Sequence, residues 1–309
     1  SGLVQLLILI QSASKIGFFP KIVWPKFDQK LKRLTIIAFP AVLSGGIIHI
    51  NLLIGRQIAS YFDGAIAWLN YADRLYQLPL GVIGIALGSI LLPRLSEKTV
   101  LENPKKMNEA VQECLKIAAM LTIPATAALL IIPLPLISVL FERGAFSNVD
   151  SQFTARALAI YGFGLPAYVL HKIFTPIFFS NGDTTTPFKI AVIAMLTNVL
   201  IAFSLIKFFG YLAPVISTTV SSWIMAILLY KKSRFLGFKM SLALLNPFIK
   251  ILVATAILSA ILILVSFEYF DLLTTSHLRT LYLFLLILFS SSTYFCVLWF
   301  LGITNKKGN

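Results

Sequence analysis

Long apolar runs separated by short polar segments dominate the chain. Complete runs cover about 33–60, 66–92, 113–140, 153–180, 188–208, 211–230, 245–267 and 279–302. Each is close to or above the roughly 20 residues that an α-helix needs to cross a bilayer. The runs lack period-2 alternation and are far longer than strands. The pattern therefore predicts an all-α polytopic membrane helix bundle with eight complete transmembrane helices.

A shorter apolar segment, from Leu3 to Ile10, stands at the start of the chain. It is too short to span a bilayer, and it has neither the basic region nor the small-residue cleavage site of a signal peptide. The chain begins with Ser1-Gly2-Leu3 rather than with Met. We therefore expect residues 1–32 to be the end of a truncated helix and a basic cytoplasmic loop, and the chain to be a fragment of a longer protein.

Composition supports the membrane class, because 58% of the residues are hydrophobic and only 12% are charged. A net charge of +14 would also suit nucleic acid, but the charges follow the loops. Lys and Arg gather around 11–32, 93–111 and 231–244 and at the C-terminus, whereas acids fall in the turns between. This alternation is the positive-inside pattern. It predicts that these basic segments, residues 181–187 and the C-terminus face the cytoplasm, that the turns near 61–65, 141–152, 209–211 and 268–278 face outward, and that no nucleic acid binds.

The helices divide into two groups by composition. The first six carry scattered Gly, Pro, Ser, Thr and Asn, which suits a bundle around a cavity, whereas the last two are almost uniformly apolar, which suits lipid contact. We expect a six-helix lobe over 33–235, and over 236–309 two peripheral helices with a short basic tail. Residues 96–112 carry mixed charges and form either a short interfacial helix or a solvated start to the next span.

One face of the 66–92 helix is polar and small. Residues at three- or four-residue steps line this face: Asn70, Arg74, Gln77, Gly81, Gly84 and Gly88. The opposite face carries Leu69, Leu80, Ile83 and Leu87. The planar guanidinium of Arg74 suits a phosphate group, and Asp73 could pair with it or orient it. The alternatives are an Asp73–Arg74 pair that joins helices, and an Arg74 side chain that reaches the outer interface.

Other polar residues in the spans have weaker signals. On the 33–60 helix, Asn51 is a candidate substrate contact, and Arg56 either contacts substrate or reaches the outer interface. A single His49 is typical of a hydrogen-bonded structural residue, and Lys172 is expected to reach the cytoplasmic interface. Interhelical hydrogen bonds are expected from Ser217, Thr218, Ser221 and Ser222. Thr197 and Asn198 are expected either to form such bonds or to coordinate a cation weakly.

Catalytic and metal-binding patterns are absent from the sequence. There is no HExxH, GxSxG or P-loop, and most carboxylates lie in the outward turns. Cys114 and Cys296 have no metal-ligand or redox spacing and read as small apolar residues. The sequence favours a transporter over an enzyme, without catalytic residues, cofactor or metal.

Several stretches in order resemble the MviN/MurJ family of lipid II flippases, within the multidrug/oligosaccharidyl-lipid/polysaccharide exporter superfamily. The matching stretches are Tyr71-Ala72-Asp73-Arg74-Leu75, Gln77-Leu78-Pro79-Leu80-Gly81, Leu91-Leu92-Pro93-Arg94-Leu95-Ser96, Phe141-Glu142-Arg143-Gly144-Ala145-Phe146, Gly164-Leu165-Pro166-Ala167 and Asp183-Thr184-Thr185-Thr186-Pro187. The resemblance implies fourteen helices in two lobes around a central cavity, with two extra helices for a lipid tail, and it aligns this chain with the seventh helix onward. It also implies that Arg74 faces the cavity and is required. Where many members have an acid three residues after that arginine, this chain has Gln77.

The resemblance implies translocation of lipid II, the undecaprenyl-pyrophosphate-linked peptidoglycan precursor, across the bacterial inner membrane by alternating access. The expected substrate-binding residues are Arg74, Asp73, Asn70, Gln77, Arg56 and Asn51. The expected partners are lipid II, membrane lipids and, as candidates, cell-wall synthesis proteins, and the expected state is a monomer. The rival interpretations are an exporter for another polysaccharide lipid carrier or a drug, a non-transporting membrane scaffold, and a lipid-modifying enzyme.

Overall fold

The computed structural model describes residues 2–15, 51–96, 104–238, 240–269 and 278–303, with isolated residues among 17–46 and at 273. The chain divides into two compact units, Ser1–Phe39 and Pro40–Asn309. The first contains helix α1 (Gly2–Lys15), which continues beyond the expected stub and presents exposed Leu7 and Leu9. Most of the expected 33–60 helix lies outside the described residues, although residues 51–59 are helical.

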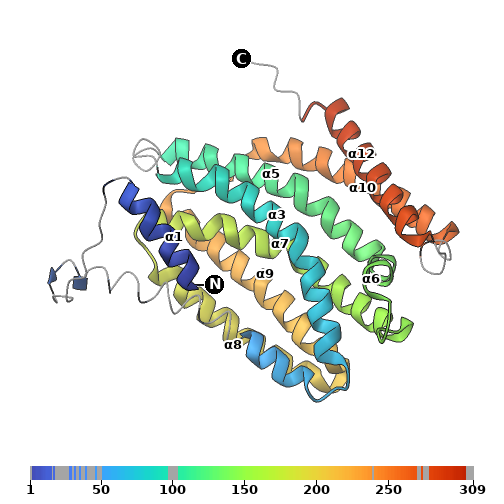
Figure 1. Ribbon diagram of the computed structural model, residues 1–309. Coiled ribbons are helices and arrows are strands. Elements are labelled where there is room, and N and C mark those ends of the chain that lie inside the picture. The colour runs from blue at the N-terminus through green and yellow to red at the C-terminus, as the bar shows by residue number, and fades with distance from the viewer. Residues whose placement is uncertain are drawn as a thin grey trace. The chain divides into compact units, whose positions relative to one another are not determined.

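The second unit is a bundle of long helices (Figure 1). Its helices are α3 (Ala65–Ser96), α5 (Pro104–Ile131), α6 (Pro133–Phe141), α7 (Asn148–Ser180), α8 (Thr185–Phe209), α9 (Ala213–Ser233), α10 (Leu245–Glu268) and α12 (Arg279–Phe300). Short 3₁₀ turns cover Gly210–Leu212, Arg234–Leu236 and Leu242–Leu244. The described residues contain no strand, which confirms the all-α prediction. Five segments in this part of the chain are long and apolar enough to cross a membrane, one of them spanning both α8 and α9, so the count of eight stays a prediction.

Helix α7 is central to this unit and packs against α3, α5 and α9, while α8 packs on α9 (Figure 1). A capping box starts α7: the Ser147 hydroxyl accepts a hydrogen bond from the Asp150 backbone N–H, and the Asp150 carboxylate accepts one from the Ser147 N–H. The helix therefore begins five residues before the expected 153. It ends before Gly182, whose φ of 73° favours glycine.

The expected uninterrupted helix over 113–140 is wrong. Helix α5 begins at Pro104, and the chain breaks at Ile132 before α6 begins with Pro133. Proline has no N–H for the helical hydrogen-bond ladder, but it is well tolerated at the first helical position. Residues 104–112 belong to α5, so they form the start of the next span and not a separate interfacial helix.

Two hydrophobic cores hold the second unit together. One joins α3, α5, α7 and α9 around fully buried side chains such as Phe174 and Phe178. The other lies where α10 and α12 meet α5 and α6, and there the buried Tyr294 donates a hydrogen bond from its hydroxyl to the Met120 carbonyl (2.7 Å). The two C-terminal helices thus share a core with the rest of the unit, and the proposed division at 235–245 stays a prediction.

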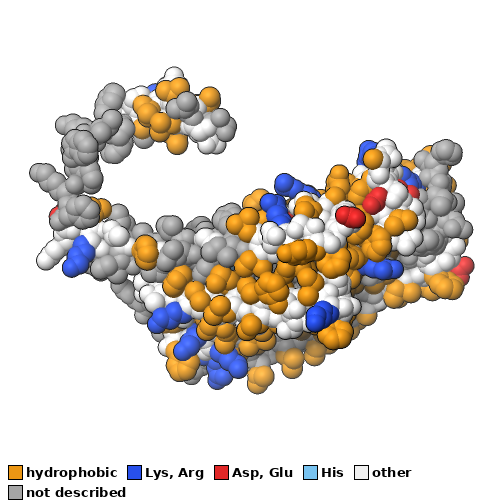
Figure 2. Space-filling view, turned by 90° about the horizontal axis from the view of Figure 1, so that it is seen from below, with side chains coloured by type: hydrophobic (Ala, Val, Ile, Leu, Met, Phe, Trp, Pro, Cys, Tyr) orange, Lys and Arg blue, Asp and Glu red, His pale blue; other side chains and the backbone are white. Residues whose placement is uncertain are grey.

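Apolar side chains also cover much of the outside of the bundle. Figure 2 shows one face, on which hydrophobic side chains form a broad area and Lys and Arg occur singly or in small groups. Exposed apolar residues occur along α8, α10 and α12, for example Leu200, Leu264 and Phe284. A surface of this kind is stable in lipid and would aggregate in water.

Polar contacts join α8 to α9 inside the bundle. Ser217 donates to the Asn198 side-chain oxygen (2.7 Å), and the Asn198 amide donates to the Thr218 hydroxyl (3.3 Å). The predicted interhelical bonds are confirmed for these residues. Ser222 forms a side-chain hydrogen bond with Tyr168 of α7 in addition to one to a carbonyl of its own helix, whereas Ser221 and Thr197 bond carbonyls of their own helices.

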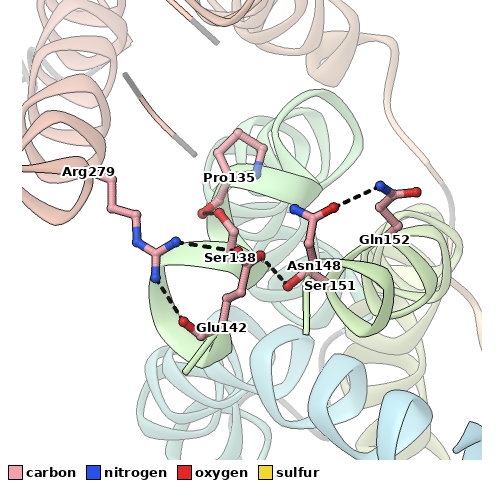
Figure 3. Close-up of polar contacts among 7 residues, drawn as sticks. All are labelled: Pro135, Ser138, Glu142, Asn148, Ser151, Gln152 and Arg279. Carbon is pink, nitrogen blue, oxygen red and sulfur yellow. Dashed lines mark hydrogen bonds and ion pairs between the residues drawn. The ribbon is translucent and has the colours of Figure 1, made fainter. Parts of the chain in front are cut away.

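A second polar link ties the start of α12 to the α6–α7 connection (Figure 3). Arg279 donates to the Glu142 backbone oxygen (2.8 Å), and one of its nitrogens lies 3.7 Å from the Glu142 carboxylate. Ser151 of α7 donates to the other oxygen of the same carboxylate (2.7 Å). Glu142 therefore bridges two helices that are far apart in the sequence.

Candidate anion-binding site

Helix α3 has two faces, as its pattern predicts. Its buried side packs into the first core through Leu75, Tyr76, Ile83 and Leu87. Asn70, Arg74 and Gln77 are exposed. These three side chains therefore lie outside the packed core.

Asp73 and Arg74 do not form an ion pair. The partly buried Asp73 carboxylate accepts a hydrogen bond from the Gln77 amide one helical turn later (2.5 Å). Arg74 makes no hydrogen bond or ion pair with any residue in the described part of the chain. The described residues therefore do not form the alternative arrangement, in which an Asp73–Arg74 pair joins two helices. No residue in the described part of the chain accepts a hydrogen bond from the Arg74 guanidinium.

A second arginine lies near the same carboxylate. Arg56 is exposed on the helical segment 51–59, and both Arg74 and Arg56 interact electrostatically with Asp73. The structure thus brings together three of the predicted site residues from two helical segments. Two guanidinium groups and one carboxylate leave an excess of one positive charge, which favours an anionic ligand.

The neutral candidates differ in their accessibility. Asn70 is exposed one turn before Arg74. Gln77 uses its amide N–H on Asp73, which leaves its carbonyl oxygen as an acceptor. Asn51 is partly buried, and its side-chain oxygen is buried without a hydrogen-bond partner among the described residues. His49 lies outside the described residues.

Aromatic contacts fix the position of the site. Just beyond Asp73, Tyr76 stacks on Tyr161 and contacts Tyr168, both on α7, with ring centroids 5.3 Å apart in each case. At the start of α3, Trp68 donates to the Asp150 carboxylate (2.7 Å) and stacks on Phe153 at 4.4 Å. Sequence reasoning missed these anchors. The Tyr161–Tyr168 spacing of seven residues places both rings on one helix face and could have indicated them.

Comparison with known proteins places the chain in a family. A sequence-family profile described as "Lipid II flippase MurJ" matches residues 1–283. The chain belongs to this family. The predicted resemblance is confirmed, and the apolar helices together with MurJ family membership make this a multi-pass membrane protein.

Individual MurJ relatives agree with this assignment. "Probable lipid II flippase MurJ" of Rhizobium meliloti (strain 1021) is 38% identical over 306 residues, which cover 98% of this chain and 57% of the relative. The protein of the same name from Rickettsia prowazekii (strain Madrid E) is 32% identical over 281 residues, or 90% of this chain and 55% of the relative. The chain thus spans a little over half the length of these relatives.

A solved structure supports the fold. "Lipid II flippase MurJ, inward closed conformation" superimposes with a TM-score of 0.70 at 22% identity, covering 89% of this chain and 55% of that chain. The helical arrangement described above is therefore one found in a MurJ structure.

Proposed function

We propose that this protein translocates lipid II across the bacterial inner membrane by alternating access, as a transporter and not as an enzyme. Relatives of the chain bear the name lipid II flippase, and the chain belongs to their family. Alternating access needs no covalent chemistry. It needs a polar site that offsets the lost hydration of a charged headgroup, exposed first to one side of the membrane and then to the other.

The observation that carries the proposal is the exposed Arg74 guanidinium in a long helix of a membrane bundle. Arginines within membrane helices are costly, roughly 2.5–3.5 kcal/mol on insertion scales at the helix centre, and those that occur usually face a partner or a water-filled cavity. Arg74 is the tenth residue of the 32-residue helix α3, one third of the way along it. The described residues supply no hydrogen-bond or ion-pair partner for Arg74. Arginine binds phosphate through two parallel hydrogen bonds, and Arg74 with Arg56 would contact the pyrophosphate of the carrier.

Asp73 moderates this site. Its carboxylate lies near both arginines, so the site carries one excess positive charge instead of two. A moderate excess suits a transporter, which must release its cargo as well as bind it. Asn70, Gln77 and Asn51 would hydrogen-bond the sugars or the peptide.

The remaining features of the proposal concern the membrane. The apolar outer surfaces of α10 and α12 would guide the polyprenyl tail, and the C-terminus would lie in the cytoplasm. The protein would act as a monomer among membrane lipids, with cell-wall synthesis proteins as candidate partners. No cofactor enters this mechanism.

The test uses the protein expressed from its native gene. Arg74→Ala and Arg74→Lys are compared for lipid II translocation and for rescue of cells depleted of their flippase, after membrane insertion has been checked. We expect Arg74→Ala to abolish rescue and Arg74→Lys to restore it only partly, because lysine lacks the planar fork. Arg156→Ala is the matched control, since that guanidinium lies over the Phe153 ring on α7 (5.8 Å). Undiminished activity in Arg74→Ala would remove Arg74 from the mechanism.

Native mass spectrometry of the purified protein separates this proposal from its rivals. Co-purified lipid II supports the flippase. A different polyprenyl-linked saccharide or a drug would instead support another exporter of the superfamily, and the absence of any such cargo in an active complex would support a scaffold.

A further inference from the structure

A cavity of about 290 Å³ lies between α3 and α7, away from Arg74. Its lining comes from the glycine-rich part of α3 and from a short polar stretch of α7: Gly84, Leu87, Gly88, His171, Lys172, Thr175 and Pro176. Pro176 has no N–H to bond the Lys172 carbonyl, so the hydrogen-bond ladder of α7 is interrupted at this level. The missing bond on α7 and the glycines of α3 lie on opposite sides of the cavity.

The Lys172 side chain lies across α3. A Cβ added at Gly84 would come within 2.5 Å of Lys172 Nζ and 3.3 Å of its Cδ. The missing side chain at Gly84 therefore makes the room that the lysine occupies. The sequence suggested that Lys172 would reach the cytoplasmic interface, but α7 continues for eight residues, or about 12 Å, beyond it.

The cavity offers several hydrogen-bond donors. Lys172 is exposed and forms no ion pair with any carboxylate in the described part of the chain. The Thr175 hydroxyl is buried and lacks a hydrogen-bond partner among the described residues, whereas Thr197 and Thr218 bond the carbonyl four residues earlier in their helices. His171 adds a ring N–H, which imidazole carries in either neutral form.

The cavity lies on the same face of α3 as the first site. Gly84 is ten residues after Arg74, which corresponds to about 15 Å along the helix axis. Gln77 and Gly81 continue the face between them at three- or four-residue steps. Two cationic side chains thus lie along one polar face of α3. Arg74 belongs to α3 itself and lies near its start, whereas Lys172 reaches the face from α7 at Gly84, about 15 Å further along.

We propose that Lys172, His171 and Thr175 form a second anion subsite, which binds the phosphate groups of a lipid-linked pyrophosphate at a different level of the membrane from Arg74. The inference rests on the proposed function and extends it. In the proposed orientation the subsite lies in the cytoplasmic half of α3, so it would receive the headgroup before Arg74 does. A headgroup that moves between two cationic positions avoids a single deep binding minimum.

The test measures binding of undecaprenyl pyrophosphate to the purified protein, expressed from its native gene, in detergent. We expect Lys172→Gln to weaken binding about tenfold, or about 1.4 kcal/mol. Gly84→Ala should have a similar effect although it keeps the charge, because its Cβ displaces the ammonium group. Lys207→Gln, an exposed lysine at the end of α8, and Gly81→Ala, where an added Cβ meets nothing within 4 Å, are the matched controls and should stay within twofold.

Additional measurements identify the ligand and distinguish a loss of binding from misfolding. Thermal unfolding checks each variant, and Gly84→Ala decides the matter if Lys172→Gln does not fold. Equal losses for phosphatidylglycerol, or losses for inorganic pyrophosphate alone, would overturn the assignment to a lipid-linked pyrophosphate. Unchanged affinity in both cavity variants, with binding lost in Arg74→Ala, would overturn the second subsite and leave the proposed function intact. Loss in Lys172→Gln without loss in Arg74→Ala would keep the subsite and refute the proposed role of Arg74.

Discussion

Gly162 of α7 lies directly against Leu129 of α5, and its replacement by alanine should be destabilising. Gly162 is buried, and an added Cβ would lie 2.7 Å from Leu129 Cβ on α5. Real Cβ atoms do not approach so closely, and Leu129 Cβ cannot move without the backbone of α5. Overpacking of this kind typically costs about 1–3 kcal/mol.

The helix propensity of alanine acts in the opposite direction. Replacing glycine inside a helix stabilises it by roughly 0.5–1 kcal/mol. Gly81→Ala in α3 gains the same contribution but meets nothing within 4 Å, so the comparison of the two variants isolates the steric part. We expect Gly162→Ala to be about 1–3 kcal/mol less stable than Gly81→Ala.

The assay is unfolding of the purified protein in detergent, by heat or by increasing denaturing detergent, followed by tryptophan fluorescence. A double-mutant cycle sharpens it. Leu129→Ala retains the Cβ that causes the conflict and should not relieve Gly162→Ala, whereas Leu129→Gly removes that atom and should show favourable coupling. A Gly162→Ala variant at least as stable as Gly81→Ala would refute the reasoning.

Two further predictions concern the polar contacts. Gln77→Glu should weaken undecaprenyl pyrophosphate binding on the order of tenfold, because it replaces a hydrogen bond to Asp73 with a second carboxylate and cancels the excess positive charge of the site. Gln77→Leu, which removes the bond without adding charge, is the control in the same titration, and equal affinities for the two variants would count against the electrostatic explanation. Asn198→Ala should lower the unfolding free energy by about 1–2 kcal/mol, since buried Asn198 makes two interhelical bonds of about 0.6 kcal/mol or more each. Thr197→Ala, which loses only a bond within α8, should change it by less than half as much in the same unfolding assay, and a larger loss there would contradict the assignment.

The helices of the second unit were predictable because their apolar runs are long, but their ends and interruptions were not. The break at Ile132 falls inside a continuous apolar stretch, where hydropathy carries no signal and only Pro133 and Pro135 indicate it. The start of α7 was missed although Ser147 and Asp150 have capping-box spacing. Polar capping residues lie outside the hydrophobic run that defined the prediction.

The candidate site was predictable as far as one helix determines it. The shared face of Arg74 and Gln77 follows from helical periodicity, and so does the reach of Gln77 to Asp73 across one turn. The position of Lys172 over Gly84 depends on how α7 is shifted along α3, which no pattern in either helix contains. The Tyr76 contacts with α7 depend on the same shift, and the Tyr161–Tyr168 spacing indicates only that α7 has an aromatic face, not which residue of α3 meets it.

The contacts between Arg279 and Glu142 depend more on the Arg279 side chain than on the Glu142 side chain. One of its contacts ends on the Glu142 backbone oxygen, which every amino acid carries, and the other ends on the carboxylate. A substitution at position 142 leaves an acceptor in place, whereas most substitutions at 279 remove the donor for both contacts. The attachment of α12 to the α6–α7 connection is therefore encoded mainly in α12, and random mutation should erode it from that end first.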